Sequence, residues 1–176
     1  MDRRKFLIAT AVLSGVTAIG LPLAANRFVA DLPTLQNALQ SFIGQELQSS
    51  GPWNVSQIFQ HLTQSVRGSY LGYPQQRGWW FQHSIGPIAL QGFKAVGAMR
   101  HPLDEVIPGM PALDAALDPQ QALTGLLTAL TEFATAATLA PHFAYGVLNH
   151  ADFAAAHQLH IRQHLSQISI VSPRMS

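Results

Sequence analysis

The sequence predicts an all-α protein, a four-helix bundle with a long irregular connection between its second and third helices. Apolar residues recur at helical spacing in four segments, which begin at residues 31, 54, 118 and 149. Polar residues suited to capping a helix stand at three of these starts, namely Asn54, Asp118 and Asn149. No segment reads as a β-strand. Four helices with connections of unequal length are typical of a four-helix bundle, and the long connection over residues 68–117 permits a crossover.

The first two helices are separated by a clear break. Residues 31–48 read as the first helix, and residues 49–52 (SSGP) end it. The second begins at Asn54, which forms a capping-box pair with Gln57, while Trp53 and Ile58 form a hydrophobic staple. His61 lies at the flank of its apolar stripe. Taken alone, His61 reads as a surface or boundary residue rather than a ligand.

The irregular connection extends from residue 68 to residue 117, and its first part, up to residue 111, is rich in aromatic residues, prolines and glycines. A short helix is expected over residues 88–98. Long connections inside a compact domain are often functional, and Tyr73 and Trp79 are candidates for the wall of a pocket. The alternative is that the aromatic residues only cap the open end of the bundle, and both interpretations stay open.

The third helix starts at Asp118, with Pro119 in its first position and Gln121 three residues after the cap. Residues 140–141 (AP) end it, and residues 142–148 read as a turn. The fourth helix, residues 149–168, is capped by Asn149.

The fourth helix carries half of the eight histidines. At about 100° per residue, His157, His160 and His164 lie on its apolar face, whereas Gln158 and Arg162 lie on the other. His160 and His164, four residues apart, lie one above the other, which suits two imidazoles bound to one ion. The alternative is a set of buried histidines that each bond to a neighbour, and this helix alone does not decide between them.

The amino-acid composition excludes several classes of protein and of metal site. Hydrophobic residues make up 48% of the chain and charged residues 11%, which excludes a disordered chain. With no cysteine there is no disulfide, thiolate zinc site or lipidated cysteine, so metal ligands must be His, Asp or Glu. Outside residues 1–25 there are seven basic and eight acidic residues, so the net charge is −1 and no nucleic-acid partner is expected.

Residues 1–25 resemble a twin-arginine signal peptide. Arg3 and Arg4 lie in a basic start, a mildly apolar run follows, and residues 23–25 (LAA) are small enough for cleavage. An ordinary secretory signal and a retained N-terminal anchor are the alternatives. We therefore expect export by the twin-arginine machinery to the periplasm or another extracytoplasmic site, with anchoring only if the signal stays uncleaved. The remaining chain has no apolar run long enough to cross a bilayer. We expect one domain over residues 26–172 and a disordered tail over 173–176.

Several short motifs resemble the DinB-like superfamily. Trp53-Asn54 followed by His61-Leu62 resembles its second helix, and residues 160–168 (HIRQHLSQI) resemble its last helix. More narrowly, residues 60–65 (QHLTQS), 72–74 (GYP) and 142–148 (HFAYGVL) resemble the branch known as domain of unknown function 1569. Gln163 departs from the pattern, which has a second histidine there. The resemblance covers roughly residues 26–168 and implies a four-helix metal-binding bundle.

The resemblance also implies a ligand set and a function. In the superfamily one histidine of the second helix and two of the last bind a divalent metal, which here implies His61, His160 and His164, with His157 a candidate fourth ligand or orienting partner. Three imidazoles suit zinc, nickel, iron or copper. The resemblance implies a metal-dependent hydrolase or thiol-dependent transferase, in which His142, His157 and Tyr145 are candidates for acid–base or supporting roles on a small-molecule substrate. The alternative is a non-catalytic, metal-stabilised binding module. Such bundles often pair, so a homodimer is also expected.

Overall fold

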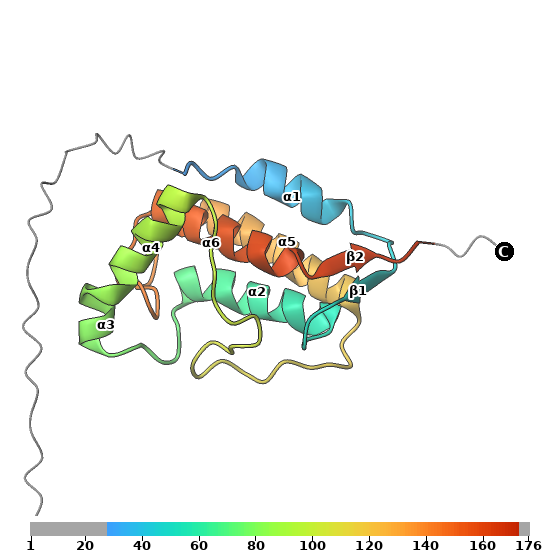
Figure 1. Ribbon diagram of the computed structural model, residues 1–176, viewed down its shortest axis with the longest axis horizontal. Helices are drawn as coiled ribbons and strands as arrows, with labels where there is room; N and C mark the ends of the chain where they lie inside the picture. Colours follow the sequence, from blue (N-terminus) through green and yellow to red (C-terminus); the bar gives the residue numbers. More distant parts are fainter. Residues whose placement is uncertain (1–27, 173–176) are drawn as a thin grey trace, which may run out of the picture.

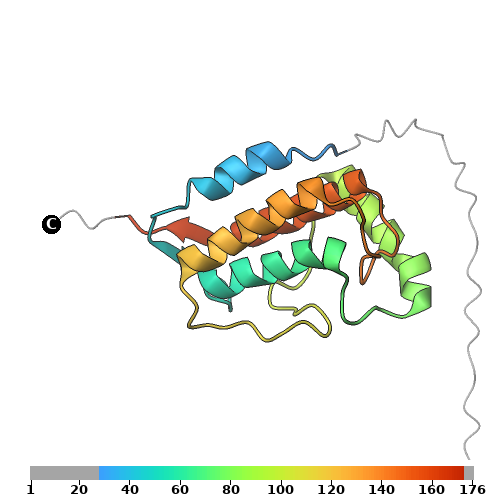
Figure 2. The ribbon, with the colours of Figure 1, turned by 180° about the vertical axis from the view of Figure 1, so that it is seen from behind.

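Four helices lie side by side along the long axis of the molecule (Figure 1; Figure 2 shows the reverse side). The computed structural model describes residues 28–172. The helices are α1 (Leu32–Gln40), α2 (Val55–Leu71), α5 (Pro119–Thr135) and α6 (His150–Leu165). The predicted all-α bundle is confirmed. The predicted signal peptide at residues 1–25 and the tail at 173–176 lie outside the described residues.

The expected caps start three of these helices. Asn54 and Gln57 form a reciprocal capping box at the start of α2. The Asp118 side chain accepts from the backbone N–H of Gln121 at the start of α5. The Asn149 side chain accepts from the N–H of Asp152 at the start of α6. Each cap satisfies a backbone donor that the first helical turn leaves free.

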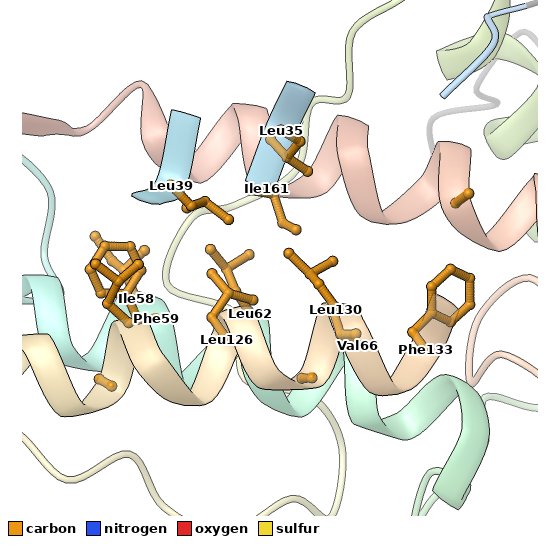
Figure 3. Packing of buried hydrophobic residues seen from close by; sticks show 14 of the residues in the cluster. Leu35, Leu39, Ile58, Phe59, Leu62, Val66, Leu126, Leu130, Phe133 and Ile161 are labelled. Carbon is orange, nitrogen blue, oxygen red and sulfur yellow. The ribbon is translucent and has the colours of Figure 1, made fainter. Parts of the chain in front are cut away.

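The core lies between the four helices, and each contributes aliphatic or aromatic side chains to it (Figure 3). In the view of Figure 3, Leu62 of α2 and Ile161 of α6 point toward the centre, and both are fully buried. The sequence neighbours of these two residues are His61 and His160. The same packing that buries the apolar stripes therefore brings histidines from distant parts of the chain to one side of the core.

The expectation of no β-strand is wrong. Strand β1 (Leu47–Ser49) pairs with β2 (Ile168–Ile170) in a two-stranded antiparallel sheet beyond one end of the bundle. The first helix accordingly ends at Gln40 rather than at residue 48, and Gly44 turns the chain with φ +74°, which glycine adopts without steric cost. The apolar residues of these short segments match helical spacing in the sequence. The segments are strands because their backbones pair with each other across the fold.

The long connection between α2 and α5 is confirmed, and it contains two helices at the opposite end of the bundle from the sheet (Figure 1). Helix α3 is Trp79–His83, and α4 is Ile85–Val96, in place of the short helix expected over 88–98. An ion pair between Lys94 of α4 and Asp152 of α6 ties this insertion to the bundle. Residues 97–118 then return without regular structure to the start of α5.

Helix α6 is buried around most of its circumference. Gln158, which helical spacing assigns to the outer face, is 3% exposed, and its side chain accepts from the N–H of Asp31 at 2.6 Å. Its outward assignment is therefore wrong, because the segment before α1 covers that face of α6. Within residues 28–172, none of the helices combines the length and the apolar character that a bilayer span requires.

Candidate metal centre

Three histidines from two helices meet beside the core. His61 lies in the middle of α2 and is 2% exposed, while His160 and His164 lie one turn apart on α6. One nitrogen of each ring lies within 4.8 Å of the corresponding nitrogens of the other two. The ring centroids are 5.0 Å apart for His61 and His160, 4.9 Å for His61 and His164, and 4.8 Å for His160 and His164. This group could hold a metal ion, and it is the ligand set that the resemblance implies.

The nitrogen positions fit a shared cation. The Nε2 atoms of His61 and His160 are 3.2 Å apart. Two nitrogens bound to one tetrahedral ion at about 2.0–2.1 Å each would be separated by about 3.3–3.4 Å. Both ring nitrogens of His164 and Nδ1 of His61 are buried without a hydrogen-bond partner in the described part of the chain. Buried polar nitrogens are costly when they lack a partner. A bound cation would remove this cost by accepting the lone pairs of these ring nitrogens.

Burial keeps these imidazoles neutral. Desolvation, together with the nearby His101, lowers the pKa of His61 to about 4. Desolvation, followed by His61 and then His101, lowers the pKa of His164 to about 3. Desolvation also holds the pKa of His160 well below its ordinary value, with His61 the next cause. All three rings therefore present lone pairs at neutral pH, which is the state that a metal binds.

Two further side chains support the group. The Oγ atom of Ser65, one turn after His61 on α2, lies 3.2 Å from Nδ1 of His160. This contact fixes the orientation of the His160 ring and leaves its Nε2 toward His61. Trp53, just before α2, stacks on His164 with ring planes 7° apart and lies 5.0 Å from the His61 ring. Trp53 thereby closes one side of the cluster against solvent.

A fourth imidazole, His101, lies beside the group and is not predicted from the sequence. Its ring centroid is 4.9 Å from that of His160 and 5.4 Å from that of His164. Nδ1 of His101 lies 2.7 Å from the carbonyl oxygen of Pro102, and because a carbonyl only accepts, this nitrogen carries the proton. Nε2 is therefore a free lone pair, and it is buried without a partner among residues 28–172. Gln163 donates to the His101 carbonyl at 2.8 Å and holds this loop on α6.

His101 has no local sequence signal. It lies in an irregular segment, where helical periodicity carries no information about side-chain direction. The adjoining residues Arg100 and Pro102 do not identify a ligand either. Its position depends on the contact with Gln163, which is 62 residues away in the chain.

A cavity of about 220 Å³ opens beside the histidine cluster, with His61, Ser65, His101 and His160 in its wall. Four other candidates from the sequence lie as follows. His142, Tyr145 and His157 line the cavity, and Tyr73 is buried behind His142 with their ring centroids 5.2 Å apart. His157 is not part of the group of three, and its ring packs on Phe133 and Phe153.

Trp79 does not line this cavity. It lies in α3, is 64% exposed, and stacks on His83 with ring centroids 4.6 Å apart. The aromatic insertion thus divides into two parts. Phe81 and Phe93 line the cavity, whereas Trp79 and Trp80 lie on the surface.

Comparison with protein families gives one match. A family model described as "Protein of unknown function (DUF1569)" matches residues 27–170, which is nearly the whole of the described chain. No curated protein and no solved structure matches the sequence.

Proposed function

Since the chain belongs to the DUF1569 family of proteins of unknown function, we propose its function from the site itself: it binds one divalent metal through His61, His160 and His164 and acts as a metalloenzyme on a small molecule. The observation that carries the proposal is the convergence of three neutral imidazoles beside the core, two of which, His61 and His160, line a cavity. The placement of the three histidines on the second and last long helices also agrees with the DinB-like superfamily that the sequence resembles.

Three imidazoles leave a coordination position for a substrate or co-substrate, which is the arrangement of catalytic rather than structural metal sites. When bound, such a metal supplies Lewis-acid activation of a water or thiol near neutral pH. The reaction classes that fit are hydrolysis and thiol-dependent transfer. Zinc, nickel and iron all accept imidazole ligands.

The chain's own residues contribute orientation and exclusion of water. Ser65 holds the His160 ring, and Trp53 covers the His61 and His164 rings. Burial raises the pKa of Tyr145 to about 12, so this cavity residue keeps its proton and remains a hydrogen-bond donor at neutral pH. We assign Tyr145 to binding or proton donation in the cavity.

A non-catalytic, metal-stabilised helical module is the second candidate, and His101 is the observation that favours it. A fourth imidazole with a free, buried Nε2 beside His160 and His164 would close the coordination shell if it also bound the ion. Closed shells of four protein ligands are typical of structural sites.

One experiment separates these candidates. The full chain is purified from its native host, its metal content is measured, and X-ray absorption counts the imidazoles bound to the metal in wild type and in His101→Ala. The enzyme proposal predicts three imidazoles in both proteins. Four in wild type and three in the variant would support the structural module, and the absence of bound metal from wild type would contradict both.

We also propose that the protein is exported by the twin-arginine route to the periplasm or another extracytoplasmic site. The support is the sequence of residues 1–25, where Arg3 and Arg4 precede a mildly apolar run. In cell fractions, conversion of Arg3 and Arg4 to lysine is expected to retain the protein in the cytoplasm. Unchanged export of that variant, or cytoplasmic wild type, would contradict the proposal.

A further inference from the structure

The protonation of His142 follows from its hydrogen bonds. Nδ1 of His142 accepts from the backbone N–H groups of Ala144 at 3.0 Å and Tyr145 at 3.2 Å. A backbone N–H only donates, so Nδ1 carries no proton and the neutral ring must carry it on Nε2. No residue within 28–172 accepts a hydrogen bond from that Nε2. Since His142 lines the cavity, its N–H is a donor available to a ligand there.

The turn that carries His142 is held on several sides. His142 and Gly146 exchange backbone hydrogen bonds at 2.8 and 3.1 Å. Arg77 donates its backbone N–H to the carbonyl of Phe143 at 2.8 Å. On the α4 side, Gly86 lies so close that a Cβ there would be 2.0 Å from the carbonyl oxygen of Ala144. The donor is therefore fixed before any ligand binds, which reduces the entropic cost of binding.

The remaining wall of the cavity is largely apolar. Side chains from α3, α4, the following loop and α6 supply it, among them Phe81, Phe93, Met99, Ile107 and Ala156. The cavity wall contains two formally charged residues, Arg77 and Glu105, whose side chains form an ion pair at 2.6 Å. Each is already neutralised by the other, so the side chains of the wall offer no free charge to a charged ligand.

We infer that this cavity binds a small, uncharged, largely apolar molecule with a carbonyl-type acceptor, and that His142 donates its Nε2–H to that acceptor. The apolar part of the molecule lies against the phenylalanine and aliphatic side chains. The inference deepens the proposed function, because it rests on the cavity beside the histidine cluster being the substrate site. Binding itself requires no metal, so it can be tested apart from the metal proposal.

The test uses three probes on the full chain, as purified and after treatment with a chelator. Acetanilide is uncharged, apolar and carries one carbonyl; ethylbenzene has a similar shape without the acceptor; 4-acetamidobenzoate adds a carboxylate. Dissociation constants are measured by NMR titration. We expect acetanilide and ethylbenzene to bind with and without metal. In the chelator-treated protein we expect 4-acetamidobenzoate to bind at least about tenfold more weakly than acetanilide, because without metal its charge would be desolvated without a partner. Equal binding of the carboxylate to the metal-free protein would overturn the inference.

The donor is tested with His142→Phe, which keeps a ring and removes the N–H. The ratio of the acetanilide to the ethylbenzene dissociation constant is expected to rise about two- to tenfold, the range for one neutral hydrogen bond. An unchanged ratio would overturn the role of His142. If the variant does not fold, the nitrogen NMR spectrum of wild type decides, since the inference requires the proton on Nε2 and a proton on Nδ1 would overturn it.

Substitutions at two alanines of α4, one in the cavity wall and one outside it, test whether the probes bind in the cavity. Ala89 lines the cavity, whereas Ala95 on the same helix is exposed. Ala89→Phe is expected to weaken ethylbenzene binding more than tenfold by filling the cavity, and Ala95→Phe is expected to leave it unchanged. Equal effects of the two substitutions would place the probe elsewhere and overturn the inference. Metal content, measured on the same samples, reports on the proposed function separately.

Discussion

The Nε2 atoms of His61 and His160 lie 3.2 Å apart although the two residues are separated by 99 positions in the chain. Neither ring has a carboxylate neighbour in the group, and both are kept neutral by burial. Two lone-pair-bearing nitrogens at this distance are explained either by a hydrogen bond between them or by a shared cation. His164, with both nitrogens buried and unpartnered in the described chain, favours the cation.

The contact between Ser65 and His160 predicts a loss of metal affinity in Ser65→Ala. Without the hydroxyl, the His160 ring is no longer held at Nδ1, and such supporting contacts typically change metal affinity by about 10–100-fold. Ser69→Ala is the matched control, because Ser69 is also buried on α2 but its hydroxyl donates to the carbonyl of Val66 and not to a histidine. Competition against a coloured chelator measures the affinity. Equal affinities of the two variants would contradict a supporting role for Ser65.

The metal-free protein is predicted to lose stability as the pH falls below about 6.5. The folded-state pKa values of His61, His157 and His164 lie at about 4, 3 and 3, below the ordinary histidine pKa of about 6.5 that the unfolded chain retains. Between these pKa values the unfolded chain binds more protons than the folded chain. As the pH falls, the free energy of unfolding therefore decreases by up to about 1.4 kcal/mol per pH unit for each histidine.

Denaturant unfolding at pH 7.5, 6 and 5, after removal of metal, measures this effect. Carboxylates titrate mostly below this window, so the slope reports on the histidines. Stability that stays flat from pH 7.5 to pH 5 would show that the cluster is open to solvent.

Alanine substitutions at two glycines of α4 are expected to change the stability of the protein in opposite directions. Gly86→Ala would place a Cβ 2.0 Å from the carbonyl oxygen of Ala144, so α4 and the His142 turn must separate, at a cost of about 1–3 kcal/mol. At Gly92 no atom lies within 4 Å of such a Cβ, and alanine there is expected to stabilise the helix by up to about 1 kcal/mol. Thermal melting of the two variants compares them. A Gly86→Ala protein as stable as wild type would show that the turn is not clamped.

Local patterns in the sequence predict the helices well because their caps and apolar stripes are short-range features. His160 and His164 follow from the same reasoning, since their spacing on an apolar face turns both inward. His61 does not, because it lies at the flank of its stripe, and its place in the cluster was implied only by resemblance.

The remaining features depend on contacts between distant residues. The pairing of Leu47 with Ile170 belongs to strands of three residues each, which are too short to show an alternating pattern in the sequence. His101 is brought to the cluster by a loop that Gln163 holds, and Gln158 is buried by the segment before α1. Each of these positions is decided by tertiary contacts, which helical periodicity does not encode.

The most direct test of the metal centre is elemental analysis of three proteins purified from the native host: wild type, His160→Ala and His83→Ala. His83 is an exposed histidine on α3 that bonds to the carbonyl of Trp79 and controls for loss of any histidine. With all three shown to be folded by circular dichroism, we predict about one metal ion per chain in wild type and in His83→Ala, and its loss in His160→Ala. Equal metal content in all three proteins, or none in wild type, would contradict the assignment.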